Sequence, residues 1–348
     1  MYEGMVDWMV LRSNDGLWDK YIHELPKEKQ DVYYTRQYCK MSELTEGGEA
    51  QLFVYETEDN VALYPYIRHI VDYKKDTSLF YDIETVYGYG GPVLKNDDHD
   101  FERAFETAFL KYCQQENIIA EFIRFHPFLK NEHLFVENID VLHNRFTVWT
   151  DLNKGIDEIW MQELSSTCRN RIRKCEKNGL TVEISEDYDE FMDIYNSTMN
   201  KVGADRFYFF NKRYYDEIKK DSSNVLMRVR QKDETLAAAV FMIYGDYFHY
   251  HLGGSKREFL ALAPNNILMW TAMQYAKEHG CKKMHFGGGL TDSKEDTLYR
   301  FKSTFSSSYA DFYIGKRIHN TEIYHKLIQK WEEEHGEKAQ ILLQYRKG

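Results

Sequence analysis

The sequence predicts a mixed α/β protein built from two domains, and three observations support this prediction. The chain has 348 residues, 43% hydrophobic and 29% charged, which is ordinary for folded domains and long enough for two of them. Helical and strand-like patterns follow one another along the first half of the chain. The second half holds three consecutive strand-like segments over residues 225–254 and then a helical segment.

The first half combines strands with one strongly amphipathic helix. Residues 60–71 and 78–85 are rich in Val, Ile, Leu, Tyr and Phe, which is typical of strands. Four aromatic side chains recur at helical spacing within residues 101–115, so we expect a helix there. Residues 119–125 are apolar and short, which indicates a buried strand.

The second half alternates between helical and strand-like segments. Turn residues separate the segments, and Gly280 ends one of the helical patterns as a C-cap would. We expect, in order, helices over residues 157–177, 185–195 and 211–220, a three-stranded antiparallel meander over 225–254, a helix from Asn265 to about His279, a strand over 282–286, a strand pair near 308–319 and a last helix over 321–335.

Charge is unevenly distributed along the chain, whose formal net charge is −11. Residues 1–150 carry 15 basic and 27 acidic side chains, whereas residues 151–348 carry 30 and 29. This change in composition places the domain boundary near residue 150, with domains 1–150 and 151–348. Duplex DNA is disfavoured as a partner because phosphate binding needs a basic face. An anionic ligand is expected to bind mainly to the second half.

Targeting features and cysteine usage favour a cytoplasmic protein. The longest uninterrupted apolar run, Leu236 to Tyr244, has nine residues, while a membrane span needs about 20. The first residues are acidic and lack the basic, then apolar, pattern of a signal peptide. The five cysteines form no CxxC pair, so a disulfide framework and a zinc ribbon are both disfavoured.

Two positively polarised features of the second half are candidate anion sites. The helix expected to start at Asn265, with a polar N-cap after a proline, would present backbone N–H groups to an anion, although an ordinary capped helix is the more common explanation of this pattern. Arg169, Arg173 and Lys177 recur every four residues and share one helix face, which suits a phosphate or pyrophosphate. A solvated helix end that compensates the helix dipole is the alternative.

Further candidates lie in residues 298–302 and in two glycine-rich segments. In LYRFK, cations alternate with aromatic and apolar residues, as in a strand or tight loop, and Lys302 could stabilise an oxyanion or be a surface cation. The segments 87–91 (YGYGG) and 285–289 (HFGGG) match neither a dinucleotide nor a Walker loop, and turns alone would explain them. His249 and His251 alternate along a strand without a third ligand, so no metal site is expected.

Together, several motifs resemble the FemABX-like branch of the GNAT acyltransferase superfamily. In the second half these are YHLGGS (250–255), LAPNNILMW (262–270), HFGGG (285–289), DTLYRFKSTF (296–305) and FYIGKRIHN (312–320). Five further segments agree in the same order, namely YYTRQYCK (33–40), YDIETVYGYGGP (81–92), FIRFHPF (122–128), RNRIRKCEKNG (169–179) and TMNKVGADRFYFF (198–210).

The resemblance implies two tandem GNAT-like domains, each a mixed, mostly antiparallel sheet flanked by helices, packed around a cleft. Domain 1–150 would bind the acceptor and domain 151–348 the donor. Members of this branch transfer an acetyl or aminoacyl group to an amine, with acyl-CoA or aminoacyl-tRNA as donor, and the best known act on nucleotide- or lipid-linked muropeptides. The family's Phe-Lys pair near the transfer centre falls on Phe301 and Lys302. The usual glycine-rich pyrophosphate loop is replaced by KREFLALAPNN, which disfavours acetyl-CoA.

These considerations predict direct acyl transfer onto an amine of a cell-wall or surface-polysaccharide precursor. Lys302 would stabilise the oxyanion. The proton of the amine would pass to Asp292 or Asp296 through water, or to the phosphate of the substrate itself. We assign donor binding to Asn265, Asn266, Arg169, Arg173 and Arg300, and acceptor binding to Arg36, Tyr87, Tyr89, His126, Tyr208 and His251. The alternatives are a non-catalytic binding module for a nucleotide- or lipid-linked saccharide and a tRNA-dependent protein aminoacyltransferase.

Overall fold

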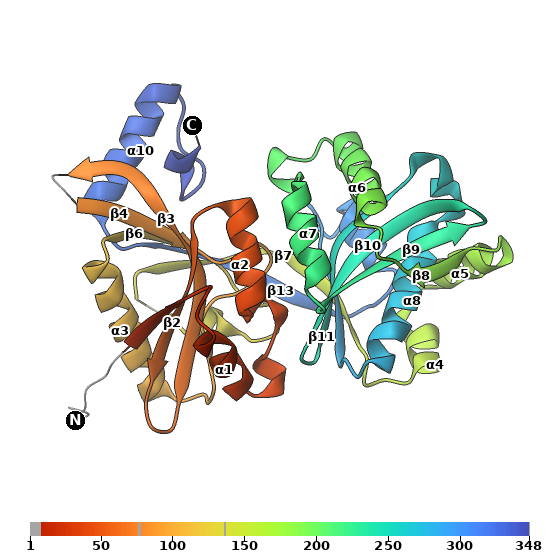
Figure 1. Ribbon diagram of the computed structural model, residues 1–348, viewed down its shortest axis with the longest axis horizontal. Helices are drawn as coiled ribbons and strands as arrows, with labels where there is room; N and C mark the ends of the chain where they lie inside the picture. Colours follow the sequence, from red (N-terminus) through yellow and green to blue (C-terminus); the bar gives the residue numbers. More distant parts are fainter. Residues whose placement is uncertain (1–7, 76–77, 136, 348) are drawn as a thin grey trace. The chain divides into compact units, whose positions relative to one another are not determined.

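The computed structural model describes residues 8–75, 78–135 and 137–347, and the chain divides into two compact units (Figure 1). Unit 1 contains residues 1–29, 33–144 and 312–348, and unit 2 contains residues 30–32 and 145–311. The division thus differs from the expected domains 1–150 and 151–348, because the last segment of the chain groups with unit 1. Residues 1–7, from which no signal peptide was expected, lie outside the described residues.

Unit 1 is built on a mixed sheet in the order β1-β2-β3-β4-β6-β13. Among the strands described for this unit, β4 and β6 form the parallel pair. The short strand β5 pairs with Ala62 and Leu63 near the start of β3. The strands are β1 (Trp8–Arg12), β2 (Glu49–Glu56), β3 (Val61–Lys75), β4 (Ser78–Glu84), β5 (Val93–Leu94), β6 (Ile118–Arg124) and β13 (Tyr309–Ile318), of which the segment from Phe312 onward belongs to unit 1.

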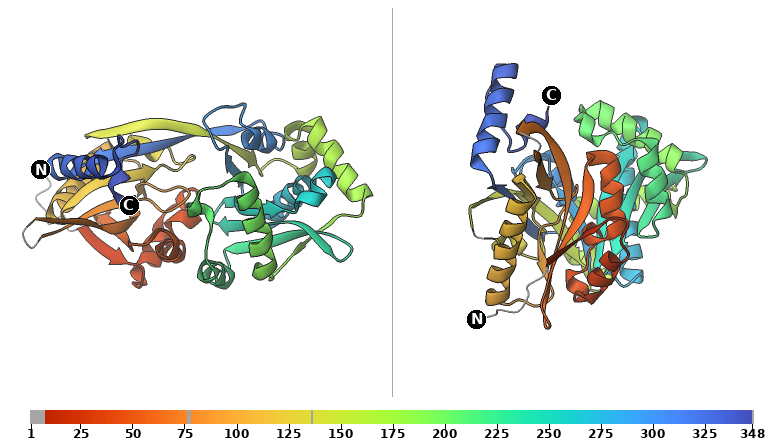
Figure 2. Two further views of the ribbon diagram at one scale, coloured as in Figure 1. Left: turned by 90° about the horizontal axis from the view of Figure 1, so that it is seen from above. Right: turned by 60° about the vertical axis from the view of Figure 1, so that its left-hand side comes forward.

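Two helices cover opposite faces of this sheet (Figure 2). Helix α3 (His99–Gln115) buries the aromatic stripe predicted from the sequence, where Phe105 and Phe109 pack on Phe53 of β2. Helix α2 (Arg36–Glu46) contacts β2 and β3 and begins at Thr35, whose side chain accepts from the N–H of Tyr38. Helices α1 (Leu17–Glu24) and α10 (Thr321–His335) complete the unit.

The strands of unit 2 follow in the order β7-β12-β11-β10-β9-β8. Among the pairings described for this unit, that of β11 with β12 is parallel and the others are antiparallel. The strands are β7 (Ile139–Asp151), which enters unit 2 at Arg145, β8 (Thr181–Ile184), β9 (Asn224–Gln231), β10 (Glu234–Tyr244), β11 (Tyr247–Ser255) and β12 (Lys283–Gly288).

Helices on both sides of the sheet of unit 2 bury its core. Helix α8 (Pro264–Glu278) contacts α5 (Ser166–Lys177) and strands β8 to β11. Helix α6 (Tyr188–Val202) contacts β10 and β11, and α7 (Lys212–Lys220) packs on α6. Two short helices, α4 (Ile156–Glu158) and α9 (Thr297–Lys302), lie at the ends of loops.

The two sheets share one topology. In each, successive antiparallel strands lead to a single parallel pair, and a helix connects the two strands of that pair: α3 between β4 and β6, and α8 between β11 and β12. The sixth strand is antiparallel in both cases, β13 beside β6 and β7 beside β12. This repeat of architecture has no counterpart in the sequence, which shows no internal repetition.

Most predicted elements are present, and three predictions are wrong. The helix expected over residues 157–177 is interrupted, because Leu164 is extended and Ser165 caps a new helix by accepting from the N–H of Cys168. The strand pair expected near 308–319 is the single strand β13. Residues 298–302 form helix α9 together with Thr297, and not a strand or loop.

Candidate functional site

The candidate site of unit 2 lies where strands β11 and β12 part. The parallel pairing recorded between them covers three residue pairs and ends at His249 and His285. Beyond this point the pairing register of both strands shifts. The shift between β11 and β10 lies near His251, and the shift between β12 and β7 lies between His285 and Gly287. Because a bulge bends a strand and re-aims its side chains, the two strands separate at this point. Such a split exposes backbone donors and acceptors to a ligand.

Lys302 contacts both strands of the split. Its Nζ donates to the carbonyl oxygen of Gly288 on β12 at 2.7 Å and lies 5.6 Å from the ring centroid of Tyr250 on β11. Only 7% of Lys302 is exposed. Burial, helped by the positive charge of Arg145, lowers the pKa of Lys302 to about 7. Near neutral pH this amine can therefore both donate and accept a proton.

Asp296 organises the loop that carries Lys302. Its Oδ1 accepts from the N–H groups of Leu298 and Tyr299, and its Oδ2 accepts from those of Leu290 and Thr291. These four bonds lower the pKa of Asp296, although partial burial opposes them. A carboxylate saturated in this way is a poor proton acceptor, so the structure favours a helix cap over the general base predicted from the sequence.

The neighbours of Asp296 fit this structural role. A Cβ atom at Gly289 would lie 2.5 Å from Oδ1 of Asp296, so the loop requires glycine there. Arg145 donates to the carbonyl oxygen of Gly289 at 2.7 Å. Asp292, the other predicted base, is exposed on the same loop.

A buried chain of three polar side chains lies at the vertex of the split. The Nε2 of His249 lies 2.9 Å from both carboxylate oxygens of Asp31, and its Nδ1 lies 3.4 Å from Nδ1 of His285. None of the three residues is more than 1% exposed. Asp31 belongs to the short segment 30–32 that groups with unit 2. Sequence reasoning missed Asp31 and His285, because nothing in the sequence relates positions so far apart.

The predicted donor-binding residues are dispersed around helices α5, α8 and α9. Asn265 is not the cap of α8, which begins at Pro264 after Ala263, and Asn266 is buried with its amide 3.4 Å from Sγ of Cys168. Both asparagines therefore lie within the first turn of the helix. The backbone N–H of Asn266 is already bonded to the carbonyl oxygen of Ala263 at 2.9 Å.

The predicted phosphate-binding arginines have other contacts. Arg169 donates to the carbonyl oxygens of Trp160, Met161 and Leu164 and so caps the C-terminal end of the preceding helical segment, residues 159–163. Arg173 is exposed, with its guanidinium 5.4 Å from the ring of Trp160. Arg300 is also exposed and pairs with Glu295 at 3.6 Å. Arg173 and Arg300 remain accessible to a ligand, whereas Arg169 has a structural role.

Two acceptor-binding candidates of unit 2 lie near α7. The ring of His251 meets the hydroxyl of Tyr214, with Nε2 and Oη 2.7 Å apart. Burial lowers the pKa of His251 to about 3, so this imidazole is neutral at physiological pH. Tyr208 is exposed in a short helical turn.

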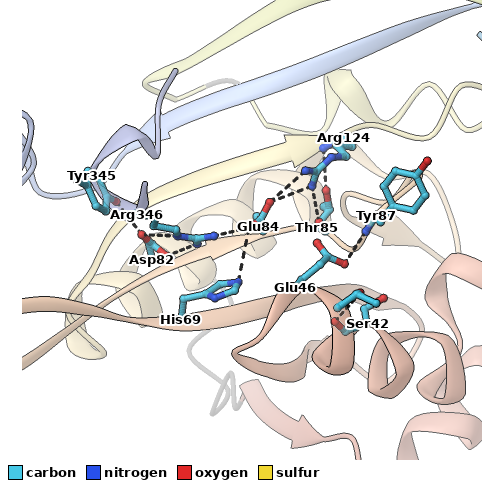
Figure 3. A network of polar contacts seen from close by, with 11 residues as sticks. Ser42, Glu46, His69, Asp82, Glu84, Thr85, Tyr87, Arg124, Tyr345 and Arg346 are labelled. Atoms are coloured by element: carbon cyan, nitrogen blue, oxygen red, sulfur yellow. Dashed lines mark hydrogen bonds and ion pairs between the residues drawn. The ribbon is translucent and has the colours of Figure 1, made fainter. Parts of the chain in front are cut away.

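The candidates of unit 1 gather beyond the carboxyl ends of its parallel strands. Tyr89 contacts His126, with ring centroids 6.3 Å apart. The backbone of Tyr87 is held on both sides, since its N–H donates to Glu46 and its carbonyl accepts from Tyr38 (Figure 3). Arg36 lies apart from them at the start of α2, in an ion pair with Asp19 at 2.8 Å. This placement parallels the split of unit 2, because both lie where a parallel strand pair ends.

Metal and membrane features are absent from the described part of the chain. Within residues 8–75, 78–135 and 137–347, no group of three or more His, Cys, Asp or Glu side chains could hold a metal ion. Among the same residues, no helix combines the length and apolar character that crossing a bilayer requires.

Comparison with known protein families finds a match within unit 2. Residues 163–303 match the acetyltransferase (GNAT) domain family. The matched segment contains β11, α8, β12 and Lys302, and all of it belongs to unit 2. This segment of the chain is therefore a GNAT-type acetyltransferase domain. The parallel pair that parts at His249 therefore belongs to this GNAT domain.

Relatives of known name cover part of the chain. The lipid II:glycine glycyltransferase of Staphylococcus aureus (strain USA300) is 27% identical over 201 residues, which make up 55% of this chain and 43% of that protein. The enzyme of the same name from strain MRSA252 matches at the same identity and coverage. The chain thus spans less than half the length of the curated relatives that it matches.

Solved structures extend the likeness in fold to most of the chain. The crystal structure of FemX superposes with a TM-score of 0.68 at 18% identity, covering 92% of this chain and 99% of that one. The C-terminal domain (DUF2156) of a putative lysylphosphatidylglycerol synthetase from Agrobacterium fabrum gives 0.54 at 15% identity, covering 88% and 90%. The predicted fold class, mixed α/β with two GNAT-like domains, is confirmed.

Proposed function

We propose that this protein is an acyltransferase that moves an aminoacyl group onto an amine of a lipid-linked cell-wall precursor. The observation that carries the proposal is the position of Lys302, a buried amine that contacts both strands of the split in a GNAT domain. The relatives named lipid II:glycine glycyltransferase support the acceptor class.

The proposed reaction is a direct displacement at the acyl carbonyl. The neutral acceptor amine attacks the carbonyl carbon, a C–N bond forms, and the negative charge passes to the carbonyl oxygen. Lys302 in its protonated form stabilises this oxyanion. The C–O bond to the donor then breaks, and the departing oxygen takes a proton.

Lys302 itself can carry the proton from the attacking amine to the leaving oxygen. The amine loses one proton as the amide forms, and the leaving oxygen gains one, so no net proton is produced or consumed. Because its pKa is about 7, Lys302 can give its proton to the leaving oxygen and recover one from the amine. Asp296, bonded to four backbone N–H groups, is not needed in this scheme.

An aminoacyl-tRNA fits the donor side better than acyl-CoA does. The first turn of α8 is preceded by a compact helical turn over residues 257–262, and Ala263 provides no side-chain cap. The segment KREFLALAPNN therefore offers no glycine-rich loop whose N–H groups could surround a pyrophosphate. The exposed guanidinium groups of Arg173 and Arg300 suit a nucleic-acid phosphate.

The test combines ligand binding with single-turnover transfer. We expect aminoacyl-tRNA and a lipid-linked muropeptide to raise the melting temperature and to give a new amide. Lys302→Met should lower the transfer rate about 10²-fold or more. The matched control is Lys330→Met, which removes an exposed lysine of α10 and should leave the rate unchanged. If acetyl-CoA is a donor and aminoacyl-tRNA is not, the proposed donor is wrong. If the precursor binds but no donor supports transfer, the protein is better described as a binding module.

A further inference from the structure

Glu46, the last residue of helix α2, is a partly buried acid that the proposed mechanism does not use. Its Oε1 accepts from the backbone N–H of Tyr87 at 2.9 Å. Its Oε2 is buried and has no hydrogen-bond partner within the described part of the chain. Figure 3 shows the carboxyl group between α2 and the start of the Tyr87 loop. A buried polar atom left in this state is costly, so a functional reason is expected.

The cations nearest to Glu46 are bound to other acids. Arg124 donates to Oε2 of Glu84 at 3.1 and 3.2 Å and to the carbonyl oxygen of Thr85 at 2.7 Å. Arg346 forms ion pairs with Asp82 and Glu84 (Figure 3). Glu46 therefore lies within an ion network without a direct ion pair of its own among the described residues.

This environment disfavours the charged form of Glu46. Burial raises the pKa of Glu46 to about 7; the charge of Glu84 adds to this effect, while Arg124, the Tyr87 N–H and Arg346 oppose it. On its own helix, Glu46 and Glu43 both act on the buried thiol of Cys39, whose pKa burial raises, and on β3 His69 faces Glu84 at 3.6 Å. Glu46 thus changes its charge within the physiological range.

The Tyr87 peptide links this acid to the glycine-rich loop 87–91. Tyr38 donates to the carbonyl oxygen of Tyr87 at 2.7 Å, so α2 holds this peptide from both sides. The following residue, Gly88, has a φ of +106°, and a Cβ there would lie 2.3 Å from the ring of Tyr33. The path of the loop is therefore set where Glu46 binds it.

We propose that Glu46 is a positioning residue that fixes the Tyr87–Gly91 loop for acceptor binding, and that loss of its proton tightens this hold. The acceptor role of the loop rests on the proposed function. The physical reason is that a carboxylate accepts a hydrogen bond about twice as strongly as a neutral carboxyl group. The Tyr87 N–H would then be held weakly at acidic pH and firmly above pH 7.

Amide hydrogen exchange of the whole protein tests the proposal without any transfer assay. We expect the protection factor of the Tyr87 N–H in the wild type to rise about threefold or more between pH 6 and pH 8. Glu46→Gln should remove this dependence, since the amide cannot ionise. The matched control is Glu43→Gln on the same helix, where Oε1 of Glu43 also accepts a backbone N–H, that of Ala50. The control should behave as the wild type does.

A second measurement keeps the proposal testable if Glu46→Gln folds poorly. In the wild type, the side-chain ¹³C signal of Glu46 and the amide ¹⁵N signal of Tyr87 should titrate with one shared midpoint between pH 6 and pH 8. Separate midpoints, or protection that stays pH-dependent in Glu46→Gln, would overturn the proposal.

Steady-state kinetics separate this proposal from the proposed function. The KM for the acceptor should fall between pH 6 and pH 8 in the wild type and stay constant in Glu46→Gln. The ratio of the wild-type kcat to the kcat of Glu46→Gln should not change with pH. If protection of the Tyr87 N–H depends on pH but the protein transfers no acyl group, the proposed transferase function is wrong and the positioning of the loop by Glu46 is still supported. Active transfer with an acceptor KM that responds to pH equally in both proteins would refute the role of Glu46.

Discussion

Replacing Lys302 with methionine should make the protein more stable at neutral pH while lowering its activity. The substitution keeps an unbranched side chain of similar volume and removes the amine. In the folded protein burial lowers the pKa of this amine from 10.5 to about 7, so the folded state disfavours the charged form. Above pH 10.5 the amine is neutral in both the folded and the unfolded state, and the shift costs no stability. As the pH falls from 10.5 toward 7, the unfolded state takes up a proton that the folded state does not, so the free energy of unfolding decreases.

The magnitude follows from this shift. Each pH unit is worth about 1.4 kcal/mol, so the shift of the wild type costs roughly 5 kcal/mol at or below pH 7. Losing the hydrogen bond to Gly288 takes back about 1–3 kcal/mol. Lys302→Met should therefore be more stable than the wild type by about 2–4 kcal/mol at pH 7. Its advantage should shrink by about 2.7 kcal/mol by pH 9, because the wild type regains stability as the unfolded state loses its proton.

Urea unfolding of both proteins at pH 7, 8 and 9 measures the difference directly. Other groups titrate alike in the two proteins, so their contributions cancel in the comparison. A difference in unfolding free energy that stays constant with pH would refute the lowered pKa of Lys302 and the proton exchange based on it. A destabilised variant at every pH would show that the hydrogen bond to Gly288 outweighs the cost of the buried charge.

Two further substitutions test the roles that the structure assigns. Asp296→Asn should retain turnover within about tenfold with an unchanged pH–rate profile, because a cap oxygen remains, whereas removing a general base costs about 10²-fold or more. Arg346→Ala should lower the free energy of unfolding in urea by about 3 kcal/mol, because Asp82 is fully buried beside it. The exposed neighbour Lys347, changed to alanine, should cost less than about 0.5 kcal/mol, and an equal loss in both variants would contradict the buried pair.

Periodicity predicted the long elements well. The aromatic stripe of α3 and the meander of β9 to β11 are complete within the sequence, so local pattern and final structure agree. Local pattern failed at α9, where six residues are too few for periodicity and the helix depends on the cap supplied by Asp296. It failed again at Ser165, whose capping bond divides what reads as one helix.

The site was less accessible to sequence reasoning because its contacts join distant positions. Lys302 was identified through a family resemblance, but the carbonyl of Gly288 and the ring of Tyr250 that surround it become neighbours only in the folded sheet. The basic face containing Arg169 looked like a phosphate site, since a sequence does not reveal that backbone carbonyls already occupy its guanidinium. Asp31 and His249 are 218 positions apart, and no local signal links them.

The pairing of β13 with β6 constrains the order in which the protein can be completed during synthesis. The part of β13 that pairs with β6 begins at Ile314, which is translated only after all of unit 2. Until then β6 is an edge strand with open backbone groups, which invites association with other chains. The half of the molecule translated first is therefore finished last. Slowing elongation before residue 312 should prolong the period in which nascent chains depend on chaperones.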